Sequence, residues 1–104
     1  MPLWERRPKK GIRREASHDD LAHLTEWART RPGCEAYVEP RTTVTEWTVM
    51  LIAGTGEWTR RRVPGQREAH EWAKKQAVPI YDVAAVGYPQ RKRDWDARRA
   101  AEGR

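Results

Sequence analysis

Residues 44–63 read VTEWTVMLIAGTGEWTRRRV, and this stretch decides the fold. Residues 44–53 are β-branched and increasingly apolar, and the second half of this stretch is predicted to form a central strand buried on both faces. Gly54-Thr55-Gly56 can supply the positive φ angles of a tight hairpin loop. Residues 57–63 then return as an antiparallel partner, so this part of the chain is predicted to form a β-hairpin.

A helix is expected on each side of this hairpin in the chain. Ser17 offers an N-cap oxygen, apolar residues recur at helical spacing from Leu21 to Ala28, and Pro32-Gly33 ends the pattern. A second amphipathic helix is predicted after Pro64-Gly65, with an apolar face made of Ala69, Trp72, Ala73 and Ala77.

Two further strands complete the pattern. Residues 34–39 alternate between apolar and polar, and residues 80–86 are apolar apart from Asp82. Pro79 indicates an edge position or the start of a strand. The order helix, strand, strand, strand, helix, strand predicts one small α+β domain with an antiparallel sheet and both helices on one face. The opposite face of the sheet is left for solvent or a partner.

The net charge of +6 is unevenly distributed. Residues 1–15 carry six Lys and Arg against two acidic residues, residues 16–87 carry nine against ten, and residues 88–104 carry six against three. A nearly neutral middle with basic ends is typical of chains that use their ends to bind polyanions, and equally of chains with solubilising ends.

These charges divide the chain into three parts. We expect a basic, flexible N-terminal arm over residues 1–15, a globular α+β domain over residues 16–90, and a basic C-terminal tail over residues 91–104. The tail can form a charged helix around Trp95, although isolated helices of that length are marginal in water.

Cysteine use and hydropathy point to the cytoplasm. Cys34 is the single cysteine, so an intrachain disulfide is excluded and a reducing compartment is favoured. No apolar run approaches the ~20 residues needed to cross a bilayer. Residues 1–14 also lack the apolar segment of a secretion signal, so we expect a cytoplasmic protein that does not contact membranes.

Signs of enzymatic chemistry are few. Cys34 could pair with His18, His23 or His70 as nucleophile and base, but a lone cysteine in a strand is usually a small buried hydrophobe. The histidine spacing matches no zinc motif, and the chain has no glycine-rich dinucleotide fingerprint. We therefore expect no catalytic residue, no metal and no cofactor.

The arginine-rich strand after Gly56 is the most unusual local feature. Strand alternation places Trp58, Arg60 and Arg62 on one face and Arg61 on the other. Phosphates would satisfy these arginines through charge-assisted hydrogen bonds, and an accessible Trp58 could stack on a base. In the alternative, Trp58 belongs to the core and the arginines pair with the neighbouring carboxylates Glu35, Glu39, Glu46 and Glu57.

The basic ends supply the other candidate contacts with nucleic acid. These residues are Lys9, Lys10, Arg13 and Arg14 in the arm and Arg91, Lys92 and Arg93 in the tail. Long cationic side chains of this kind bind the phosphates of DNA or RNA with little dependence on the nucleotide sequence.

Four segments carry a resemblance to a known family: VEPRTTVT at residues 38–45, GEWTRRRV at 56–63, PIYDV at 79–83 and GYPQR at 87–91. They resemble a family of small actinobacterial proteins of uncharacterised function whose members often carry an automatic oxidoreductase label. The likeness spans residues 34–94. The label implies a small oxidoreductase with a copurifying flavin or nicotinamide, and it identifies no catalytic residue.

The order helix, three strands, helix is also similar to the double-stranded RNA-binding domain. In that domain a lysine cluster at the start of the second helix contacts phosphates, whereas Lys74 and Lys75 fall late in the second predicted helix. The likeness is one of topology and identifies no binding residues.

The residues favour a nonenzymatic nucleic-acid-binding or nucleoid-associated accessory protein, contacting DNA or RNA phosphates through the arginine-rich strand and the basic ends. The alternative is an adaptor that recognises another protein through the exposed sheet face or a tail. A third hypothesis is the oxidoreductase that the resemblance implies.

Overall fold

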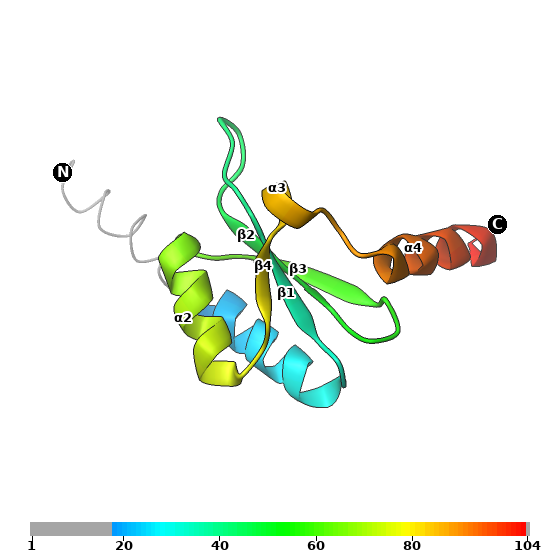
Figure 1. Cartoon of the computed structure of the whole chain (residues 1–104), viewed down its shortest axis with the longest axis horizontal. Helices are drawn as coiled ribbons and strands as arrows, with labels where there is room; N and C mark the ends of the chain where they lie inside the picture. Colours follow the sequence, from blue (N-terminus) through cyan, green and yellow to red (C-terminus); the bar gives the residue numbers. More distant parts are fainter. Residues whose placement is uncertain (1–17, 104) are drawn as a thin grey trace, which may run out of the picture.

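The computed structural model describes residues 18–103, and the predicted N-cap Ser17 lies outside them. The described part has the predicted α+β class (Figure 1). Its elements are a helix over residues 18–30, β1 (Glu35–Glu39), β2 (Thr48–Ile52), β3 (Trp58–Arg62), α2 (Gln66–Gln76), β4 (Ile80–Asp82), α3 (Val83–Val86) and α4 (Gln90–Glu102). Within this part, every helix is too short or too polar to cross a membrane.

The strands form one mixed sheet in the order β3-β2-β1-β4. The predicted hairpin is confirmed, because β2 pairs antiparallel with both β3 and β1. The prediction of a wholly antiparallel sheet is wrong in one respect, since β4 pairs in parallel with β1. The reason is the crossover through α2, which returns the chain to the end of the sheet where β3 began. As a result β4 runs in the direction shared by β3 and β1.

The second half of the stretch 44–53 forms β2, as predicted, whereas β4 is shorter than expected. β4 ends at Asp82 instead of continuing to Val86. The Asp82 carboxylate accepts a hydrogen bond from the Ala84 N–H at 2.9 Å and caps the short helix α3. The local preference of an aspartate for an N-cap therefore outweighs the apolar character of the residues that follow. β4 begins directly after Pro79 at the edge of the sheet, as predicted.

The main core lies between the sheet and the two helices predicted to share one of its faces. Leu24 and Trp27 of the first helix and Trp72 of α2 pack against Val38 and Val49 of the sheet. Burying each such side chain contributes roughly 1.5–3 kcal/mol. The apolar helical faces read from the sequence are therefore the faces that meet the sheet.

The opposite face of the sheet is partly covered, although the sequence analysis left it open. A second, smaller cluster is built on Tyr37, Met50 and Ile52, which are at most 5% exposed. Val83 and Tyr88, from the chain that follows β4, pack against this cluster. The C-terminal part of the chain thus covers part of the face that was expected to contact solvent or a partner.

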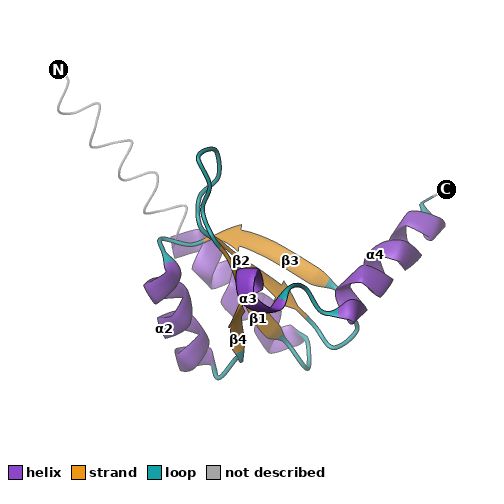
Figure 2. Cartoon of the chain, turned by 45° about the horizontal axis from the view of Figure 1, so that its top comes forward, coloured by secondary structure: helices purple, strands orange, loops and turns teal. Residues whose placement is uncertain are grey.

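The C-terminal helix α4 leaves the sheet and projects away from it. In Figures 1 and 2 it lies on the far side of the molecule from the point where the first helix begins. Its first turns contact the β2–β3 hairpin, where Arg91 Nε donates to the carbonyl of Ala53 at 2.9 Å. The expected basic tail is therefore a helix with one docked end and one projecting end.

Candidate nucleic-acid interface

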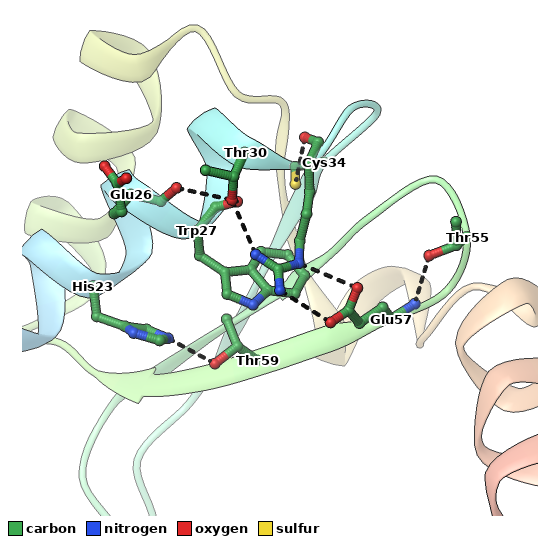
Figure 3. Close-up of polar contacts among 9 residues, drawn as sticks. His23, Glu26, Trp27, Thr30, Cys34, Thr55, Glu57 and Thr59 are labelled. Atoms are coloured by element: carbon green, nitrogen blue, oxygen red, sulfur yellow. Dashed lines mark hydrogen bonds and ion pairs between the residues drawn. The ribbon is translucent and has the colours of Figure 1, made fainter.

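The first helix runs alongside β3, and this placement decides where the arginines of β3 point. Near the end of the helix, Arg31 Nε lies 3.1 Å from Glu57 Oε1, and the guanidinium sits 4.3 Å above the Trp27 ring (Figure 3). Further back along the helix, His23 Nε2 lies 2.9 Å from Thr59 Oγ1. The start of the helix therefore lies beside the C-terminal end of β3, where Arg61 and Arg62 stand.

Arg61 and Arg62 share a single carboxylate. The Nε atoms of Arg61 and Arg62 lie 3.7 and 3.8 Å from the two oxygens of Asp20, distances beyond a direct hydrogen bond. Their side chains are 42% and 58% exposed, whereas that of Asp20 is 15% exposed. Two guanidiniums thus face one carboxylate, which leaves a net positive charge and accessible N–H donors. We call Arg61 and Arg62 the basic pair.

His23 borders the basic pair on the helix. Its Nδ1 lies 3.4 Å from a terminal nitrogen of Arg61. Burial lowers the pKa of the His23 imidazole, and the positive charge of Arg61 lowers it further, although Asp20 acts in the opposite direction. The neutral form of His23 is therefore favoured, and it can accept a hydrogen bond from Arg61.

The basic arm joins the domain next to this pair. The first described residue, His18, is two positions before Asp20, so the arm is covalently attached beside Arg61 and Arg62. The predicted contacts Lys9, Lys10, Arg13 and Arg14 lie outside the described residues. Two basic regions that are far apart in sequence are thus connected at one end of the molecule.

Arg60 has a different environment from the basic pair. Its Nε and one terminal nitrogen donate to the two carboxylate oxygens of Glu39 at 2.7 and 2.8 Å. Glu39 also accepts from the hydroxyls of Thr48 and Tyr88. Burial alone would raise the pKa of Glu39, but the hydrogen bonds from Arg60, Tyr88 and Thr48 outweigh burial and lower it. Arg60 therefore pairs with a carboxylate of the sheet, as the alternative interpretation of the arginine run predicted.

Trp58 is held under the C-terminal helix. Its indole N–H donates to Asp96 Oδ1 at 2.8 Å, and its ring packs against the cluster of Tyr37, Met50 and Ile52. The ammonium of Lys92 lies 5.1 Å from the ring centroid and the guanidinium of Arg60 lies 5.5 Å from it. The ring already has cationic and apolar neighbours at the place where a base would stack.

The C-terminal candidates lie at the other end of the molecule from the basic pair. Besides the carbonyl of Ala53, Arg91 donates to Glu35 Oε1 at 2.7 Å, and Lys92 lies 2.7 Å from Asp96 with its side chain 18% exposed. Arg93 is exposed on α4. Arg91 and Lys92 thus fix the docked end of α4, and the structure does not bring any of the three together with Arg61 and Arg62.

Asp20 is the residue of this site that the sequence analysis missed. Its carboxylate faces both arginines of the basic pair. The aspartate and the arginines are far apart in sequence, so no local pattern could connect them. Knowing that the first helix lies along the edge strand would have been enough to suggest this pairing.

Among the shallow hollows on the described surface, two are candidate sites, and neither is lined by an activated group. The larger, of about 470 Å³, lies between Arg31, Cys34 and the end of α2, and the smaller, of about 330 Å³, lies between Pro32 and Thr55. The Cys34 thiol donates to the carbonyl of Arg31 at 3.4 Å, and burial raises its pKa, so the unreactive thiol form prevails. In the part of the chain that the structure describes, no three His, Cys, Asp or Glu side chains converge as metal ligands would.

The oxidoreductase that the resemblance implies stays a prediction. An absorbance spectrum of the purified protein tests it, because a bound flavin absorbs visible light. Comparisons of the chain with protein-family models, with curated proteins and with solved structures found no match.

Proposed function

We propose that this protein is a nonenzymatic nucleic-acid-binding protein that contacts phosphates through its N-terminal arm and the basic pair, Arg61 and Arg62. The observation that supports the proposal is the shared carboxylate of Asp20, which two half-exposed guanidiniums face at the root of the arm. Guanidinium groups donate several N–H bonds in a planar fork that matches the oxygens of a phosphate.

The distribution of charge supports different roles for the arm and the basic pair in binding nucleic acid. Residues 18–103 carry 14 Lys and Arg against 13 Asp and Glu, so the domain is nearly neutral. The arm, with six basic residues against two acidic ones, therefore supplies most of the attraction, and the pair supplies fixed donors beside it.

The same geometry gives the other candidate residues a structural role. Arg60, Trp58, Arg91 and Lys92 each have a partner within the domain at short range. Removing one of these partners leaves a polar group without its hydrogen bond, which costs about 1–3 kcal/mol when the group is buried. We therefore assign these four residues to the stability of the fold.

Fluorescence anisotropy of labelled oligonucleotides tests the proposal. Affinity is expected to fall steeply between about 50 and 200 mM salt. For each phosphate contact, the logarithm of the binding constant should fall by roughly 0.7–0.9 per log unit of salt concentration, and we call this dependence the salt slope. A variant with Lys9, Lys10, Arg13 and Arg14 replaced by alanine should lose most of this slope. The double variant Arg61→Ala/Arg62→Ala should bind more weakly and lose a slope of up to about 2, one for each phosphate contact removed.

A control with the same change in charge separates the site from general attraction. Lys74 and Lys75 are exposed in the last turn of α2, at the opposite end of that helix from β3. The double variant Lys74→Ala/Lys75→Ala removes two charges, as the Arg61/Arg62 variant does, and should bind almost as the natural protein does. Absence of binding, or binding that does not depend on salt, would refute the proposed function.

A further inference from the structure

The loop between β1 and β2, residues 40–47, projects beyond the sheet as a narrow finger (Figures 1 and 2). Val44, in the middle of this loop, is 88% exposed. The two other large apolar side chains that are prominently exposed on the described surface, Tyr81 and Val86, are 38% and 59% exposed. A largely exposed valine on a projecting loop is a group that gains from burial against a partner.

Hydrogen bonds within the finger hold its tip in one shape. Thr42 Oγ1 accepts from the N–H groups of Val44 and Thr45 at 3.2 and 3.1 Å. The Thr42 N–H donates to the carbonyl of Thr45 at 3.0 Å, and the two threonine hydroxyls lie 2.7 Å apart. These bonds form a side-chain turn that points Val44 away from the domain. The finger is therefore preorganised, which lowers the entropy cost of binding.

The base of the finger lies beside the basic pair. Glu39 and Thr48, at its two ends, are joined by a hydrogen bond of 2.7 Å. Trp47 accepts a hydrogen bond at 2.9 Å from the N–H of Val63, the residue after Arg62. In both views the finger rises next to the tip of the β3 arrow, where the first helix begins. The finger, the pair and the root of the arm thus lie at one end of the molecule.

We propose that this finger enters the major groove of duplex DNA, with Val44 against the base edges, while the basic pair contacts the flanking phosphates. The proposal rests on the proposed function and adds the class of nucleic acid and the groove. Arg41 and Glu46 offset each other, so the finger itself carries no net charge and is suited to base edges rather than to phosphates.

The dimensions of nucleic acids favour the major groove of DNA. That groove is about 12 Å wide and admits a two-stranded ribbon, whereas the minor groove of B-form DNA is about 6 Å wide. In A-form RNA the major groove is deep and too narrow for side chains to read. An apolar side chain such as valine finds a partner in the thymine methyl group, which lies in the major groove. Duplex DNA is therefore expected to bind more tightly than duplex RNA.

Chemical protection of duplex DNA with dimethyl sulfate tests the proposal, because the reagent methylates guanine N7 in the major groove and adenine N3 in the minor groove. The intact chain should protect N7. Replacing Val44 by alanine should weaken binding to duplex DNA several-fold and reduce N7 protection, and Val44→Asp should weaken binding by about tenfold or more. Val44 is exposed, so neither change should alter thermal unfolding.

Thr55→Asp is the matched control, because it puts the same charge on the β2–β3 hairpin loop, at the opposite end of the sheet. It should bind duplex DNA as the natural protein does. Salt-dependent binding that is unchanged by Val44→Ala, or protection of adenine N3 alone, would refute the proposed entry of the finger into the major groove. Neither result would contradict the proposed function. No binding of any nucleic acid by the intact chain would refute both. Binding to a protein that survives nuclease treatment and is lost in Val44→Asp would assign the finger to a protein partner instead.

Discussion

Glu39 joins three segments of the chain through one carboxylate. It accepts hydrogen bonds from Arg60 of β3, Thr48 of β2 and Tyr88 of the segment before α4. Glu39→Ala would leave all three donors without their acceptor. We expect the free energy of unfolding to fall by about 1–3 kcal/mol, measured by urea denaturation at neutral pH.

An exposed glutamate provides the control for this change. Glu71→Ala on α2 removes the same charge from a solvated position and should alter stability by no more than about 0.5 kcal/mol. Equal stability of the two variants would contradict the role assigned to Glu39.

His23 makes stability depend on pH in a predictable direction. Burial and then the charge of Arg61 hold its pKa below the value of about 6.5 found in unfolded chains. Below that pH the unfolded chain binds a proton more readily than the folded chain, so stability is lost as the pH falls. We expect the free energy of unfolding to be lower at about pH 5.5 than at about pH 7.5, and the difference to shrink in His23→Gln.

The glutamine variant keeps a polar group facing Thr59 and Arg61 but cannot titrate. If His23→Gln and the natural protein lost the same stability over this range, another group would be responsible. The sign of the change in the free energy of unfolding decides the test, since a histidine whose pKa was raised on folding would stabilise the protein as the pH fell.

At the scale of elements, docking of α4 depends on a close approach at Gly56. Gly56 has a φ of +96°, and a Cβ placed there would collide with the carbonyl oxygen of Arg91 and lie 2.9 Å from the Cβ of Trp95. Gly56→Ala should therefore push α4 off the hairpin. Because a free helix of this length is marginal in water, its amides should exchange with solvent much faster, as measured by hydrogen exchange.

A substitution at Gly87 provides the control, because it introduces backbone strain without a steric collision. Its φ is +73°, but no atom lies within 4 Å of a Cβ built there. Gly87→Ala should thus cost about 1–3 kcal/mol of strain without displacing α4. If the two variants gave the same exchange rates in α4, the contact at Gly56 would not hold the helix in place.

The elements also indicate what the sequence could and could not predict. The hairpin over residues 48–62 was predictable because its turn glycines and its strand pattern are local. The parallel pairing of β4 with β1 was not, since it depends on how α2 carries the chain across the sheet. The end of β4 at Asp82 follows from competition between capping and strand propensity, which the sequence pattern alone does not resolve.

The candidate site was likewise predictable from the sequence only in part. The run Arg60-Arg61-Arg62 stood out in the sequence, where strand alternation grouped Arg60 with Arg62 and separated both from Arg61. In the folded chain Arg60 meets Glu39, whereas Arg61 and Arg62 meet the first helix at Asp20. Alternation did not predict this grouping, because the first helix lies beside the edge strand β3 and its Asp20 faces both Arg61 and Arg62.

At the scale of the whole molecule, the start of the first helix at His18 and the projecting end of α4 lie on opposite sides. The arm is attached beside the basic pair, and α4 projects from the opposite side (Figure 1). Charges separated by much more than the Debye length, about 10 Å at 0.1 M salt, act almost independently on a bound phosphate. The two ends should therefore contribute unequally to binding.

Two variants with the same loss of charge test this inequality. Removing residues 97–104 takes away three arginines and one glutamate, a net loss of two positive charges, and keeps the contacts of Arg91, Lys92 and Asp96 with the domain. Lys9→Ala/Lys10→Ala removes two positive charges from the arm. The arm variant should lose a salt slope of about 1 for each phosphate contact that disappears, measured by anisotropy, and the truncation should leave the slope nearly unchanged. Equal losses would mean that net charge alone attracts the nucleic acid, and a larger loss on truncation would move the binding surface to α4.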